Sequence, residues 1–73
     1  MDNKWWKYLV FEVFAGKVIR AQSTDAVLNQ RLIELPAFEA MTCVGICGWE
    51  LVSVLPIDGH PDQYGMYYFK SLD

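Results

Sequence analysis

Apolar residues in the first part of the chain recur with a period of two. Residues 5–14 are dense in aromatic and β-branched side chains, which favour strands. The turn signal Ala15-Gly16 follows, and residues 17–21 are short and β-prone. The pattern therefore predicts a hairpin. Alternation along its first strand places Trp6, Tyr8 and Val10 on one face and Leu9, Phe11 and Val13 on the other.

A second pair of strands is predicted near the end of the chain. Residues 49–55 form an apolar run that Pro56 closes, and residues 64–70 are rich in aromatic side chains. Between them, residues 58–62 hold the Asp58-Gly59 turn signal and Pro61, which cannot donate to a strand ladder. We expect a loop there, with the two strands paired as a hairpin.

The middle of the chain changes to helical signals. Pro36 suits the first position of a helix, and residues 37–44 continue it to a stop at Gly45 or Gly48. Residues 23–35 leave two interpretations open. Residues 23–25 are suitable caps for a further helix, but the segment is equally compatible with a loop that contains a short extended piece.

The predicted order of strand, short strand, helix, strand and strand indicates an α+β fold. We expect an antiparallel-rich sheet of three to four strands with one main helix packed on one face, all within a single domain spanning residues 1–73. A chain of this size buries only about 60% of the surface that its unfolded form exposes. A partner subunit would therefore add to its stability.

Charge and hydropathy exclude several classes of partner. The net charge at pH 7 is −3 and the basic residues are scattered, which argues against nucleic acid. Charged residues interrupt the apolar amino-terminal run, which matches neither a signal peptide nor a membrane span. We therefore expect a small acidic protein that stays in the cytoplasm and does not bind membranes. The basic residues are Lys4, Lys7, Lys17, Arg20, Arg31 and Lys70.

Three short segments carry a family resemblance. They are Gly45 followed by Gly48-Trp49-Glu50-Leu51-Val52-Ser53-Val54, the early Trp6-Lys7-Tyr8 and the late Tyr68-Phe69-Lys70. In this respect the chain resembles the small family catalogued as domain of unknown function 4177. The resemblance implies a helix that ends in a glycine, a strand that begins at the Trp-Glu-Leu-Val segment, and an aromatic strand at each end of the chain. It implies no activity and no ligand residues.

The chain departs from that family pattern before the glycine. Family helices usually carry polar and charged residues there, whereas residues 41–47 read Met-Thr-Cys-Val-Gly-Ile-Cys. The outer side of the helix thus holds only Glu39 and Thr42 as polar residues beside Cys43 and Ile46. Either this side meets a second subunit or protein partner, or Ile46 and Cys47 tuck under the turn that follows the helix.

Candidate chemical groups are few. The single histidine, His60, belongs to no recognisable motif with a serine or cysteine nucleophile. Cys43 and Cys47 stand four residues apart, but a structural zinc site needs four ligands, so we interpret them as reduced, buried side chains. A weak cation site at Asp58, His60 and Asp62 is less favoured than a solvated turn. We therefore predict no enzyme activity, no cofactor and no metal.

The long strands are apolar on both faces, and one helix can cover only one of them. The sequence therefore predicts a protein-interaction module, a homo-oligomer that scaffolds or inhibits a partner protein. The alternative is a small-molecule sensor or sequestering protein with an aromatic-lined pocket at a subunit interface. We expect Trp49 to pack in the core beside Phe38 and Met41. The candidate interface residues are Cys43, Ile46, Leu9, Phe11, Tyr67 and Phe69.

Overall fold

The computed structural model describes residues 6–57 and 63–72 of the chain. They form a four-stranded antiparallel sheet and two helices, which confirms the predicted α+β class. The predicted loop at residues 58–62, with its candidate cation ligands Asp58, His60 and Asp62, lies outside the described residues. The elements are β1 (Trp6–Phe14), β2 (Lys17–Gln22), α1 (Ala26–Leu32), α2 (Ala37–Ile46), β3 (Glu50–Pro56) and β4 (Tyr64–Leu72).

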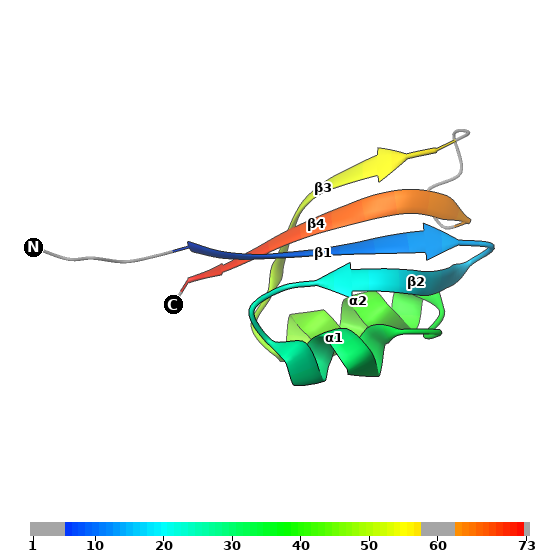
Figure 1. Cartoon of the computed structure of the whole chain (residues 1–73). Coiled ribbons are helices and arrows are strands. Elements are labelled where there is room, and N and C mark those ends of the chain that lie inside the picture. The colour runs from blue at the N-terminus through cyan, green and yellow to red at the C-terminus, as the bar shows by residue number, and fades with distance from the viewer. Residues whose placement is uncertain (1–5, 58–62, 73) are drawn as a thin grey trace, which may run out of the picture.

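The two longest strands form the centre of the sheet. The strand order is β2-β1-β4-β3, and β1 pairs with β4 over its whole length (Figure 1). The β1–β2 hairpin turns at Ala15 and Gly16, both with positive φ (53° and 81°), as the two-residue turns that match strand twist require. The strands predicted at residues 5–14, 17–21, 49–55 and 64–70 thus all form, with shifted ends.

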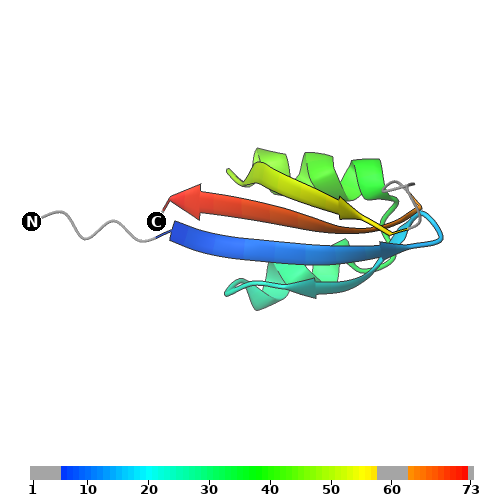
Figure 2. The same cartoon turned by 90° about the horizontal axis from the view of Figure 1, so that it is seen from above.

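Two helices cover the sheet, where the sequence led us to expect one main helix. Both lie on the same side of the sheet (Figure 1), and in the view from above α1 lies on the β2 side and α2 on the β3 side (Figure 2). Of the two interpretations of residues 23–35, helix or loop, the structure shows a helix, α1, within this segment. Asp25 is its N-cap, and the Asp25 Oδ1 accepts a hydrogen bond of 3.0 Å from the backbone N–H of Leu28.

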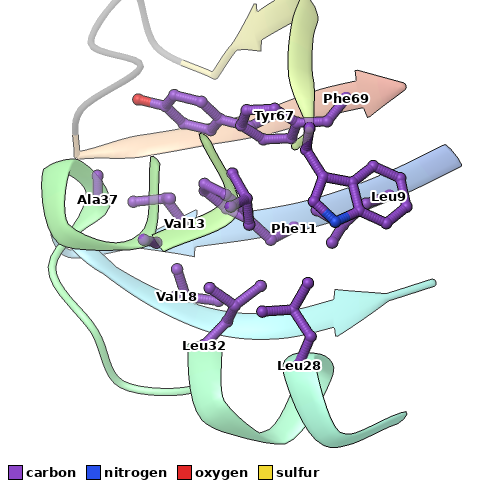
Figure 3. Close-up of a cluster of buried hydrophobic side chains, with 12 residues drawn as sticks. Leu9, Phe11, Val13, Val18, Leu28, Leu32, Ala37, Tyr67 and Phe69 are labelled. Carbon is purple, nitrogen blue, oxygen red and sulfur yellow. The ribbon is translucent and has the colours of Figure 1, made fainter. Parts of the chain in front are cut away.

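Burial alternates along β1 and β4, so one face of the sheet is covered and the other is open. Figure 3 shows Leu28 and Leu32 of α1 facing Val18, with Phe11 and Tyr67 projecting from the central strands. The ring centroids of Phe11 and Tyr67 lie 5.0 Å apart in a stacked pair. The buried core consists of Leu9, Phe11, Val13, Val18, Leu28, Leu32, Ala37, Ala40, Val44, Trp49, Tyr67 and Phe69.

The end of α2 places Trp49 in this core. The N–H of Gly48 donates to the Gly45 carbonyl and the N–H of Trp49 donates to the Val44 carbonyl, both at 3.0 Å, which is the Schellman arrangement. Gly48 has a φ of 92°, a conformation that favours glycine. Trp49 is buried as predicted, but its predicted neighbour Phe38 is 75% exposed on the other side of α2. That part of the prediction is wrong.

Where β2 begins, its outer edge is paired with the segment that joins the two helices. The N–H of Val18 donates to the Leu35 carbonyl (2.9 Å), and the N–H of Glu34 donates to the Val18 carbonyl (2.7 Å). The N–H of Ala37 donates to the Gly16 carbonyl at 3.1 Å. These bonds satisfy backbone groups that an edge strand would otherwise present to another chain.

Candidate functional site: the open face of the sheet

The face of the sheet turned away from the helices carries a continuous set of large apolar side chains. We call this surface the open face. It is centred on β1 and β4, where Trp6 pairs with Leu72, Val10 with Tyr68 and Phe14 with Tyr64. Tyr8 is 65% exposed. The other apolar members of the open face are Leu55 and Met66, which pair with each other across β3 and β4.

Two pairs of opposite charge stand across neighbouring strands on the open face. Glu12 and Arg20 stand opposite each other on β1 and β2, with 3.9 Å between the Glu12 Oε1 and the Arg20 Nη1. Glu50 and Lys70 are likewise opposite on β3 and β4. The Nζ of Lys70 also lies 4.3 Å from the ring centroid of Trp6, a cation–π contact. The open face is therefore mainly apolar, and Glu12 and Lys70, its charged residues on the central strands, each stand opposite a residue of opposite charge on an outer strand.

A groove adjoins the open face at one end of the sheet. Since β2 ends at Gln22, which pairs with Val10, the first residues of β1 extend beyond it. The groove beside them has a volume of about 570 Å³ and is lined chiefly by apolar atoms. Its polar wall is formed by Gln22, Ser23 and Thr24. An apolar concavity with a few polar groups is the usual form of a small-molecule site.

A second, smaller apolar surface lies on the outer side of α2. Phe38 and Ile46 are 75% and 82% exposed there, with Thr42 between them. The Thr42 hydroxyl donates back to the Phe38 carbonyl at 3.0 Å, so its proton is satisfied within the helix. Ile46 belongs to the helix and projects outward, which contradicts the interpretation that it tucks under the following turn.

The two cysteines differ in their surroundings. Cys43 is half-buried and packs against the core, whereas Cys47 is exposed. The prediction that both are buried is therefore wrong for Cys47. The reason is that α2 ends at Ile46, and Cys47 is the capping residue at which the chain leaves the helix.

Four of the predicted interface residues are in the core of the single chain. Leu9, Phe11, Tyr67 and Phe69 lie beneath the helices and are almost fully buried, so their prediction as interface residues is corrected. Alternation separated the two faces of each strand correctly. It did not show which face the helices cover, because both faces are apolar. Trp6, Tyr8, Phe14 and Leu55 lie on the exposed side, and the candidate list missed them.

The described residues present little chemistry of the kind that enzymes use. None of the polar or charged side chains in residues 6–57 and 63–72 is buried. Nor do three or more His, Cys, Asp or Glu side chains of that part of the chain gather closely enough to hold a metal ion. The features that stand out here are apolar surfaces and not a cluster of titratable groups.

Comparison with known proteins gives no further assignment. No family model, no curated protein and no solved structure matches this chain. Within the described residues, neither helix has the length and apolar character needed to cross a membrane. The surfaces of the molecule are therefore the basis for assigning a function.

Proposed function

We propose that this chain is a non-enzymatic protein-interaction module that works as a homo-oligomer and scaffolds or inhibits a partner protein. The observation that carries the proposal is the open face, an apolar sheet surface left exposed opposite the helices. Monomeric proteins seldom expose a contiguous apolar patch of this kind unless it serves binding. The resemblance to the domain of unknown function 4177 family is compatible with the proposal but adds no partner.

Self-association is tested by the mass of the protein in solution. Sedimentation equilibrium over a broad range of micromolar concentrations should give at least twice the 8.4 kDa of the single chain. The mass should fall on dilution, because association follows mass action. A constant mass of one chain at every concentration would contradict the proposal.

The groove beside β1 supports a second candidate function, the binding of a small apolar molecule. Its volume of about 570 Å³ falls within the range of small-ligand pockets, and Trp6 and Tyr8 supply aromatic walls. Titration with the apolar fluorophore 8-anilinonaphthalene-1-sulfonate tests it. Saturable binding at one site per chain, weakened in Tyr8→Ser, supports a ligand site. Binding that the substitution leaves unchanged contradicts it.

A further inference from the structure

We propose that the open face is the contact between two copies of this chain, which pack face to face as a two-sheet sandwich. The inference rests on the proposed homo-oligomer and assigns its contact surface. Sheets that pack in this way lie about 10 Å apart, with side chains of the two inner faces interdigitated. Tyr8, Val10 and Tyr68, from the two central strands, would lie at the middle of that contact.

Parts of both sheet edges are protected against pairing with another chain, whereas the open face is not. Where β2 begins, its outer edge is paired with the segment between the helices through the hydrogen bonds at Val18 and Gly16. At the other edge, β3 has an irregular register between Leu51 and Ser53 and ends at Pro56, which has no N–H to donate. These are devices that discourage edge-to-edge assembly. A second copy therefore has the open face as its largest unprotected surface.

The area of the open face suits a second copy. The central strands have nine residues each and the sheet has four strands. At about 3.3 Å per residue and about 4.8 Å between strands, and with the outer strands shorter, the face has a projected area of roughly 500 Å². Two copies would bury roughly 1,000 Å² in flat projection, which reaches the approximate threshold for a specific interface. Projecting side chains increase that area. A single extended peptide would cover only about one strand's width of this surface.

Charge also permits two open faces to meet. The pairs Glu12–Arg20 and Glu50–Lys70 are each neutral within one copy, so apposed copies bring no uncompensated like charges from these pairs together. Glu12 and Lys70 stand on the central strands, and their partners Arg20 and Glu50 on the outer strands, so each pair extends toward the rim, where an interface keeps its polar groups. Lys17, at the corner beside the hairpin turn, is exposed and can stay in water.

The apolar surface on α2 is too small to hold such a dimer alone. A helix of ten residues is about 15 Å long, so a stripe about 10 Å wide offers roughly 150 Å² per copy. Two such stripes would bury roughly 300 Å², which is the scale of a crystal-packing contact. Phe38 and Ile46 therefore remain outside the proposed contact.

Charge substitutions on the two apolar surfaces test the assignment. Tyr8→Glu and Leu55→Glu introduce a carboxylate on the open face, from β1 and β3, and Ile46→Glu does the same on α2. Val27→Glu is the matched control, because Val27 is as exposed as Tyr8 but lies on α1. The dissociation constant of the dimer is measured by sedimentation equilibrium, and far-ultraviolet circular dichroism reports the fold of each subunit.

The expected result is a rise of about tenfold or more in the dissociation constant for both open-face variants. For Leu55→Glu the reason is that burying an unpaired charge is costly. For Tyr8→Glu the new carboxylate shares Lys70, which stands opposite it, with Glu50, so each copy brings an excess negative charge into the contact. Ile46→Glu and Val27→Glu should leave the constant unchanged. If a glutamate variant does not fold, Tyr8→Thr and Leu55→Thr remove apolar area while keeping strand propensity, and the same rise is expected.

The contrary results separate two failures. A dimer that is weakened by Ile46→Glu, or that survives both open-face substitutions, would overturn the assigned surface and leave the homo-oligomer intact. A wild-type protein that stays monomeric throughout the concentration range would overturn the proposed function together with this inference.

Discussion

The two faces of the sheet have nearly the same kind of side chains but different surroundings. On β1, Phe11 is fully buried beneath the helices, and Tyr8, three residues earlier, points the other way and is 65% exposed. Burial of a large apolar side chain is worth about 1.5 to 3 kcal/mol over leaving it in water. The covered face thus stabilises the single chain, whereas the exposed side chains of the open face, such as Tyr8, do not contribute that free energy to its folding.

The difference shows that hydrophobicity alone does not separate the core from an exposed apolar surface in a small domain. The residues of the covered face and those of the open face are both mainly apolar, and both alternate with a period of two. What distinguishes them here is the position of α1 and α2 on one side of the sheet. Substitutions that act differently on the two faces therefore test this description most directly.

The largest effect is expected from Phe11→Ala on the covered face. The centroid of its ring lies 5.0 Å from that of Tyr67 and 5.3 Å from that of Phe69, so truncation leaves a cavity beside these two rings. We expect a loss of about 3 to 5 kcal/mol in the free energy of unfolding, measured with urea. The matched change on the open face, Tyr8→Ala, should cost less than about 1 kcal/mol at concentrations where the protein is monomeric. Equal losses would break the comparison.

Substitution by alanine should change the stability with opposite sign at two glycines, one in the last turn of α2 and one just after its end. A Cβ at either Gly45 or Gly48 would meet no atom within 4 Å, so neither change creates a clash. Gly48→Ala should cost about 1 to 2 kcal/mol because its φ is 92°. Gly45→Ala, inside the helix, should stabilise by about 0.5 to 1 kcal/mol. Thermal unfolding of both variants measures the difference, and a stabilising Gly48→Ala would contradict the capping role.

A smaller loss of stability is expected from substitution of Asp25, the residue that caps the start of α1. Asp25→Ala removes the oxygen that accepts from the Leu28 N–H, at a cost of about 1 kcal/mol. Asp25→Asn keeps a side-chain oxygen and should be close to neutral. Chemical unfolding of the two variants checks this, and equal losses would show that the charge, and not the cap hydrogen bond, matters at this position.

The smallest effect is expected on the open face itself. Lys70→Gln removes the ammonium group that lies over Trp6, and an exposed cation–π contact contributes about 0.5 to 1 kcal/mol. Lys70→Arg should retain most of that contribution, because guanidinium also stacks on aromatic rings. The free energy of unfolding, measured at a concentration where the protein is monomeric, reports the contribution of this cation–π contact alone. A loss as large as that for Phe11→Ala would mean that Lys70 supports the core.

Much of the local structure could be predicted from the sequence because its causes are local. The alternation of Leu9, Phe11 and Val13 with Tyr8 and Val10 reflects the period of a strand. Ala15-Gly16 identified the hairpin turn. Gly48 is placed where the chain leaves α2 because only a few backbone conformations end a helix in this way, and glycine adopts them most easily.

The sequence could not decide which side of each element the rest of the chain would cover. Phe38 and Ile46 are exposed and Ala40 is buried because α2 meets the sheet through its small residues, which a helical pattern of mixed apolar residues does not specify. The chain after α1 pairs with the sheet edge because β2 supplied hydrogen-bond partners for Glu34 and Leu35 that are distant in sequence.

The sequence by itself therefore determined the strands, the hairpin turn and the end of the main helix, since these follow from backbone sterics and side-chain periodicity within a few residues. Only the tertiary structure decided that Leu9, Phe11, Tyr67 and Phe69 form the core and that Trp6, Tyr8 and Leu55 remain on the surface. Two apolar faces are equivalent in a strand considered alone, and they become different when both helices pack on the same side of the sheet.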